Sequence, residues 1–128
     1  MSSIGIFVHE TRAIPYATAI VKGYKTIETR TRNMLGKFVG QQVAVIRTSD
    51  NKPSEVIGFV RITGCKFCTA EELDGMRDNT LIPPGSKFDC HSKGKWCYEL
   101  SKPRECPPIP VSALPYLKKT RSYIVFPF

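Results

Sequence analysis

Six short runs of strand-forming residues and two short helical patterns limit this 128-residue chain to a small, mostly β fold. β-branched and aromatic residues fill the six runs, which cover residues 4–8, 25–32, 42–47, 56–62, 96–100 and 122–126. Helices are expected at 16–21, ended by Gly23, and from Thr69 to Met76, where Glu72 completes a capping box. The pattern predicts an α+β fold, mostly β: a small, mostly antiparallel β-barrel with two or more short helices, formed by residues 1–128 as one domain.

Two segments interrupt this pattern. Residues 79–95 contain prolines and glycines and show no regular hydrophobic period, so they are expected to be irregular. Residues 103–110 contain four prolines, which have no backbone N–H to donate within a sheet. This stretch is therefore expected to be extended, at an edge of the sheet or outside it.

The charge of the chain indicates the kind of partner. Nineteen Lys and Arg side chains against eleven Asp and Glu give a net charge of +8. Residues 22–47 hold six of these cations and a single acid, Glu28. Such an excess attracts polyanions, so RNA or a nucleotide-like ligand is the expected partner. Two further basic clusters, which are either solvated faces or parts of a path for phosphates, comprise Lys87, Lys93 and Lys95, and Lys118, Lys119 and Arg121.

Targeting patterns and cysteine usage favour a cytoplasmic protein without a membrane span. Residues 1–10 lack the cationic start and apolar run of a signal peptide, and no stretch has the roughly 18 apolar residues of a membrane helix. The five cysteines are an odd number, which favours reduced thiols over a disulfide framework. No cofactor is expected.

Four of the cysteines leave three interpretations open. Cys65 and Cys68 form a C-x-x-C pair, and Cys90, next to His91, and Cys97 would complete a set of zinc ligands. Free cysteines are also often buried as small apolar side chains, and a C-x-x-C pair can be redox-active. The second pair lacks the tight spacing of a zinc ribbon, which favours structural thiols and no metal site.

Residues 25–32 carry the chemistry that points most directly to a ligand. Lys25 follows the helix-ending glycine and can offer a point charge to a phosphate or a base carbonyl. Glu28 can accept hydrogen bonds from the exocyclic amine of a base, and Arg30 can bind phosphate or stack on a base. The other side chains expected to contact the ligand are Tyr16 and Tyr98, as stacking walls, and Arg32.

The same residues also allow a purely structural interpretation. Glu28 and Arg30 are two positions apart on a strand and share a face, so they can form an ion pair that only fixes the strand. Alternation places Lys25 and Glu28 on opposite faces, and a shared pocket therefore requires Lys25 to precede the strand, or a bulge to intervene. The two histidines, His9 and His91, are more typical of surface or core positions than of catalysts.

Three separated segments together resemble the ASCH domain family. The first is Pro15-Tyr16-Ala17 with Ile20, and the second, from Gly23 to Arg30, matches the family pattern G-x-K-T-x-E-x-R as Lys25-Thr26-Ile27-Glu28-Thr29-Arg30. The third is Tyr98-Glu99-Leu100, followed by Pro103-Arg104 and Pro108-Ile109-Pro110-Val111. Ile14 departs from the pattern, since the family usually has Gln before the Pro-Tyr pair, and residues 65–95 match least.

This resemblance implies a PUA-like fold, a small mixed β-barrel with a cleft bordered by short helices. It implies binding of RNA or of a modified nucleobase through the cleft at residues 23–30. An enzyme on the same scaffold is the alternative, either a ribonuclease or an amidohydrolase that acts on N4-acetylcytidine, with Lys25 and Glu28 as its catalytic residues. The amidohydrolase branch has a Thr where this chain has Glu28, which argues against that activity. A protein-interaction domain is the third possibility.

Overall fold

The structure is a computed structural model that describes residues 2–90 and 93–128. Its helices and strands follow the order β1 (Ser3–His9), α1 (Tyr16–Val21), β2 (Ile27–Arg30), a 3₁₀ turn (Gly36–Phe38), β3 (Gln42–Ser49), β4 (Lys52–Cys68), α2 (Ala70–Asp74), α3 (Arg77–Thr80), β5 (Lys95–Pro110), a second 3₁₀ turn (Val111–Ala113), β6 (Lys118–Lys119) and β7 (Tyr123–Phe126). All six predicted strands and both predicted helices are present. The short elements α3 and β6 were not predicted.

The seven strands form one sheet in the order β2-β5-β4-β3-β1-β7-β6. β1 pairs with β3 in parallel, and the other pairs of strands are antiparallel. The α+β, mostly β fold class is therefore confirmed. The expected barrel is open, because β2 and β6 end the sheet and no pairing joins them within the part of the chain that the structure describes.

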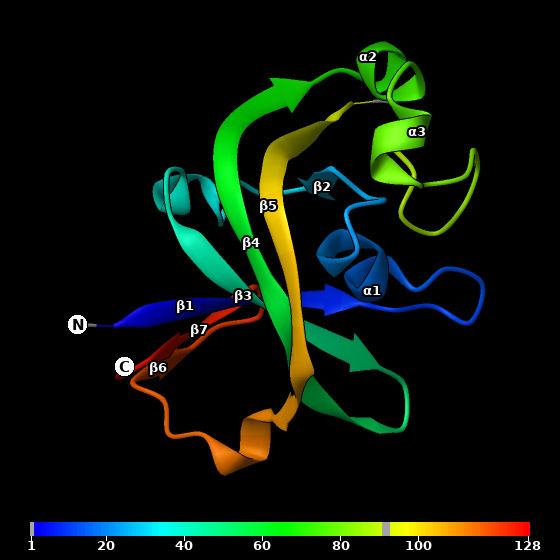
Figure 1. Ribbon diagram of the computed structural model, residues 1–128. Coiled ribbons are helices and arrows are strands. Elements are labelled where there is room, and N and C mark those ends of the chain that lie inside the picture. The colour runs from blue at the N-terminus through cyan, green and yellow to red at the C-terminus, as the bar shows by residue number, and fades with distance from the viewer. Residues whose placement is uncertain (1, 91–92) are drawn as a thin grey trace.

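Two long strands, β4 and β5, extend across the whole molecule (Figure 1). They lie side by side and bend over at the end that leads to α2 and α3. Their register shifts at three points, two of them beside Gly58 and Gly64. Such bulges increase the bend and twist of a strand. The start of β5, residues 96–99, lies at the bent end and pairs with β2.

The proline-rich stretch is the second half of β5. Residues 104–110 pair with β4 alone, for example Ile109 with Val56, whereas β2 pairs only with residues 96–99. The other side of this half of β5 is thus a free edge in the described sheet, where a missing N–H leaves no partner unsatisfied. The expectation of an extended edge segment is confirmed. β5 is, however, far longer than the strand predicted at residues 96–100.

Helix α1 is short and depends on neighbours for its position. Pro15 provides no side-chain cap, and the carboxylate of Glu10 accepts hydrogen bonds from the backbone N–H and the hydroxyl of Thr18, at 2.9 and 2.7 Å. Gly23 follows the helix with a φ of +84°, the left-handed conformation expected of a glycine that ends a helix. The apolar side of α1 packs on β3 and β4, and this fixes Tyr16 at the edge of the core.

The predicted capping box of α2 is present. The Thr69 hydroxyl accepts a hydrogen bond from the Glu72 N–H at 3.2 Å, and the Glu72 carboxylate accepts one from the Thr69 N–H at 3.0 Å. Helix α3 follows directly and is joined to the start of β2, since Thr26 N–H donates to the Asn79 carbonyl at 3.0 Å. None of the described helices has the length and the apolar character needed to cross a membrane.

Gly58 is a close-contact point between α1 and the two long strands. A Cβ atom at this position would lie 2.2 Å from the carbonyl oxygen of Arg104 and 2.7 Å from Cγ1 of Val21. We expect Gly58→Ala to lower the free energy of unfolding by about 1–3 kcal/mol, because overpacking forces the backbone to move. Urea unfolding followed by circular dichroism measures the change.

The matched control is Gly64→Ala on the same strand, where the added Cβ would meet only the movable Glu99 side chain at 3.3 Å. This variant should stay within about 0.5 kcal/mol of the parent. Equal stability of the two variants would show that the close approach at Gly58 does not limit the packing of α1.

Candidate functional site

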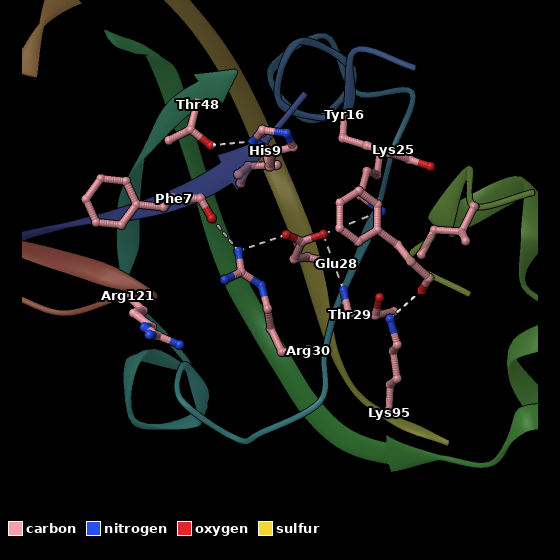
Figure 2. Close-up of a pocket in the computed structure, with 13 residues that line it drawn as sticks. Phe7, His9, Tyr16, Lys25, Glu28, Thr29, Arg30, Thr48, Lys95 and Arg121 are labelled. Carbon is pink, nitrogen blue, oxygen red and sulfur yellow. Dashed lines mark hydrogen bonds and ion pairs between the residues drawn. The ribbon is translucent and has the colours of Figure 1, made fainter. Parts of the chain in front are cut away.

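A cavity of about 260 Å³ lies between the end of β1, α1, β2 and the loop that leads into β5 (Figure 2). Polar side chains line it from residues 25–30, and aromatic side chains line it from β1, α1 and that loop. Figure 2 shows the Glu28 carboxylate near the centre of this group, with Arg30 on one side and Lys25 on the other. The predicted hollow beside residues 25–30 is therefore present.

Glu28 is held between two cations. Its Oε1 lies 3.5 Å from the ammonium of Lys25 and its Oε2 lies 2.9 Å from Nη2 of Arg30. The backbone N–H of Thr29 also donates to Oε1 at 3.3 Å. A carboxylate accepts about four hydrogen bonds, so one acceptor position remains, on Oε2. Glu28 lines the cavity, and this position has no hydrogen-bond donor among the described residues.

Lys25 precedes β2, and this placement is one of the two that allow Lys25 and Glu28 to share a pocket. The N–H groups of Tyr24 and Lys25 both donate to the carbonyl of Ala19, so the turn after Gly23 fixes Lys25 against α1. Its ammonium donates to the carbonyl of Thr80 and lies 5.2 Å from the centre of the Tyr16 ring. The ammonium of this 2% exposed residue thus has a carbonyl, a carboxylate and an aromatic ring around it.

Arg30 joins the ion pair to β1. Its Nη2 donates to the carbonyl of Phe7 at 2.6 Å as well as to Glu28. Glu28 and Arg30 share a face of β2, as their spacing predicted, and both line the cavity. The ion pair is therefore structural, and it also forms part of the surface that a ligand would meet.

The charges in this cluster set its protonation. Burial alone would raise the pKa of Glu28, but Arg30 and Lys25 outweigh it, and the net effect is a pKa below the ordinary value of 4.5. Burial lowers the pKa of Lys25, and this effect exceeds the opposing effect of Glu28. Burial likewise lowers the pKa of Lys95, another cation that lines the cavity. Glu28 is thus ionised at neutral pH and faces more cations than it can neutralise.

Aromatic side chains form the apolar walls. The rings of Tyr16 and Phe88 meet edge to face with their centres 5.8 Å apart, and His9 meets Phe88 in the same way at 6.4 Å. The three rings come from three different parts of the chain, namely α1, the loop before β5 and the end of β1. Together with the charged cluster, they make a small aromatic cavity with polar groups at one side.

Not every predicted site residue reaches the cavity. Lys25, Glu28, Arg30 and Tyr16 line it, as proposed from the sequence. Tyr98 is fully buried in the core, where its hydroxyl donates to Oδ1 of Asn33 at 2.9 Å, so it is not a wall of the cavity. Tyr98 pairs with Glu28 across the strands, and its ring belongs to the main core. Arg32 is exposed in the loop after β2 and lines a neighbouring hollow instead.

Several cavity residues could not be predicted from local sequence patterns. Phe7 and Thr48 lie on separate strands that only the parallel pairing of β1 and β3 brings together. Phe88 lies in the irregular segment that resembles the family least. Lys95 and Arg121 belong to the two basic clusters noted in the sequence, and the other members of those clusters do not line the cavity within the described residues.

The fold separates Cys65 from the other three cysteines of the predicted set. Cys68 and Cys97 lie in a small buried cluster and Cys90 packs against it, whereas Cys65 faces the main core, because residues three apart on a strand point to opposite sides. Burial and the Cys68 thiol raise the pKa of Cys97 to about 12, so it remains a thiol. Among residues 2–90 and 93–128, no three His, Cys, Asp or Glu side chains are placed to hold a metal ion. His91 lies outside the described residues.

Comparison with solved structures defines the fold. The chain is similar to a serine-to-alanine variant of the ASCH protein from Zymomonas mobilis, with a TM-score of 0.73 and 17% identity over 93% of this chain and 85% of that one. It is also similar to a structure of the ASCH protein itself (TM-score 0.68, 18% identity, 84% and 74% covered) and to a tyrosine-to-phenylalanine variant (0.63, 19%, 84% and 76%). This chain has the ASCH fold. No family model and no curated protein matches the sequence.

We expect the Glu28 cluster to make the stability of this ASCH fold sensitive to acid. The folded-state pKa of Glu28 lies below its ordinary value of 4.5, so the pairing contributes stability above about pH 4.5 and loses it as the pH falls through the folded-state value. Glu28→Gln should lower the free energy of unfolding at pH 7 by about 3–5 kcal/mol, because it leaves buried Lys25 without its counter-charge. The variant should also lose less stability than the parent between pH 5 and pH 3.

Urea unfolding at several pH values measures both effects. Glu99→Gln, at an exposed carboxylate on β5, is the matched control and should behave like the parent. An acid sensitivity of Glu28→Gln equal to that of the parent would show that the ion pair contributes nothing to the pH dependence.

Proposed function

We propose that this protein belongs to the ASCH family and binds RNA or a nucleotide, with a planar base in the cavity between α1 and β2. Membership is supported by the shared fold together with the motif residues from Lys25 to Arg30, which lie at the cavity. The single observation that carries the binding proposal is the buried, ionised Glu28 at an open cavity that is otherwise aromatic and cationic.

Each part of a nucleotide has a matching group in the cavity. The faces and edges of Tyr16, Phe88 and His9 offer apolar contact to a flat heterocycle. The free acceptor position on Oε2 of Glu28 suits the exocyclic amine of cytosine, adenine or guanine. The excess of cations over the single carboxylate suits a phosphate. A volume of about 260 Å³, close to the lower end of small-molecule sites, favours one base over a larger ligand.

The aromatic wall provides the test. We expect Phe88→Ala to weaken binding of cytidine, adenosine and guanosine monophosphates by about 1–3 kcal/mol, the usual contribution of one aromatic contact to a base. Phe67→Ala is the matched control, because Phe67 is 46% exposed on β4 and does not line the cavity. Isothermal titration calorimetry at low salt measures the affinities. Equal affinity of the two variants, or no binding to the parent, would contradict the proposal.

A hydrolase at the same site is the second candidate, and the burial of Lys25 favours it. A lysine whose pKa is lowered by burial is a better base near neutral pH, and Glu28 is within reach to orient water or carry a proton. These are the two residues that the sequence suggested as catalytic.

If this second candidate is correct, the parent protein will cleave single-stranded RNA or deacetylate N4-acetylcytidine, and Lys25→Met will abolish turnover. Methionine keeps most of the volume and removes the proton-carrying group. Lys22→Met is the control, since Lys22 lies outside the cavity and pairs with Glu105 at the surface. Chromatographic assay of both substrates, with circular dichroism to show that the variants fold, checks this. Absence of turnover by the parent on both substrates would leave binding alone.

A further inference from the structure

Two further hollows share lining residues with the cavity, and both include Arg121. One, of about 500 Å³, also shares Arg30 with the cavity and extends to Arg32. The other, of about 820 Å³, shares Phe7 and Thr48 with it and extends to residues 116–120. Figure 2 shows Arg121 at the side of the cavity, between Phe7 and Arg30. Arg121 is therefore the one residue that lines all three hollows among the described residues.

The turn that carries Arg121 is fixed to the sheet. The hydroxyl of Thr120 accepts hydrogen bonds from the N–H groups of Ser122 and Tyr123, at 3.1 and 3.0 Å. The carbonyl of Ser122 accepts a hydrogen bond from the N–H of Phe7 on β1 at 3.0 Å. The backbone of Arg121 is thus held beside the cavity, while its side chain is exposed.

The two outer hollows are lined by cations and contain no acid. Their charged residues are Arg30, Arg32, Lys119 and Arg121. Arg30 is used by the ion pair with Glu28, but none of the ion pairs among the described residues includes the other three. By contrast, Arg47 and Arg77, which lie outside these hollows, are paired with acids.

Tyr116 adds an aromatic surface to the larger hollow. Its ring is 56% exposed and lines the hollow that also holds Lys119. Cations that follow a groove, with an exposed aromatic ring beside them, are the features with which proteins bind single-stranded nucleic acid independently of sequence.

We propose that the cavity takes one nucleotide of a single-stranded polynucleotide, whose neighbouring phosphates lie along a basic track formed by Arg32, Arg121 and Lys119. This inference rests on the proposed function, and it specifies the substrate as a strand rather than a free nucleoside or mononucleotide. Arg121 lines both the cavity and the two outer hollows, so a base in the cavity would leave its neighbouring phosphates beside the track. Charge complementarity over three hollows that share Arg121 favours this occupant over an isolated phosphate.

The experiment compares a mononucleotide with short single strands. Cytidine, adenosine and guanosine monophosphates are titrated by calorimetry, and fluorescently labelled five-nucleotide RNA and DNA strands of mixed sequence by anisotropy, from 50 to 200 mM salt. We expect at least one type of strand to bind at least about tenfold more tightly than the mononucleotides at low salt. For three phosphate contacts, log K should fall against log salt with a slope near −2, because each contact on a single strand contributes about 0.7.

Variants of the track separate it from the cavity. Arg32 and Lys119 line only the outer hollows. Arg32→Ala and Lys119→Ala should therefore each make the slope of log K against log salt shallower by about 0.7 for the strand, and leave mononucleotide binding unchanged. Arg61→Ala is the matched control, an exposed arginine on β4 that lines none of the three hollows, and it should change neither quantity.

The outcomes distinguish this inference from the proposed function. One set of results would overturn the track and retain the cavity. In it, Phe88→Ala weakens mononucleotide binding, but the strands bind no more tightly than the mononucleotides, and Arg32→Ala and Lys119→Ala leave the salt slope unchanged. A labelled polyglutamate peptide that binds as tightly as the strands, with the same dependence on the track, would overturn the assignment to a polynucleotide. Failure of every nucleotide probe to bind would overturn both proposals.

Discussion

The buried carboxylate of Glu28 is the interaction on which the site depends. It pairs with Lys25 and Arg30, and these two cations donate to backbone carbonyls on other elements, Thr80 at the end of α3 and Phe7 on β1. One short strand is thereby connected to a helix on one side and to the central sheet on the other. Because an isolated buried charge is costly, each member of the cluster depends on the others, and their geometry fixes the cavity beside them.

A structural ion pair and a ligand site are compatible in this arrangement. Among the described residues, no buried side-chain nitrogen or oxygen of the cluster lacks a hydrogen-bond partner, which explains how these charged side chains can be buried or partly buried. The cluster still exposes one acceptor position of Glu28, the aromatic edge of Tyr16 and the partly exposed Arg30 to the cavity. A site built in this way is preorganised, since the charges that meet a ligand are already held in place by the fold.

Exposed cations near the two ends of the open sheet are the second feature of this surface. β2 and β6 are the two ends of the sheet and do not pair in the described residues. The turn after β6 places Arg121 beside the cavity, and the loop after β2 places Arg32 on the next hollow. Arg77 is paired with acids and stabilises the fold, whereas Arg32, Lys119 and Arg121 along the hollows have exposed side chains without an acidic partner among the described residues.

The sequence by itself determined the local elements and the chemistry of one segment. Periodicity and capping residues predicted the strands, α1 and α2, and the spacing of Glu28 and Arg30 predicted their shared face, because these features depend on neighbours within a few residues. Only the tertiary structure decided the lengths of β4 and β5, the burial of Tyr98 and the membership of Phe7, Phe88 and Arg121 in the cavity. Those properties depend on pairing between segments many residues apart, and no local pattern specifies which distant strand, loop or turn will lie against another.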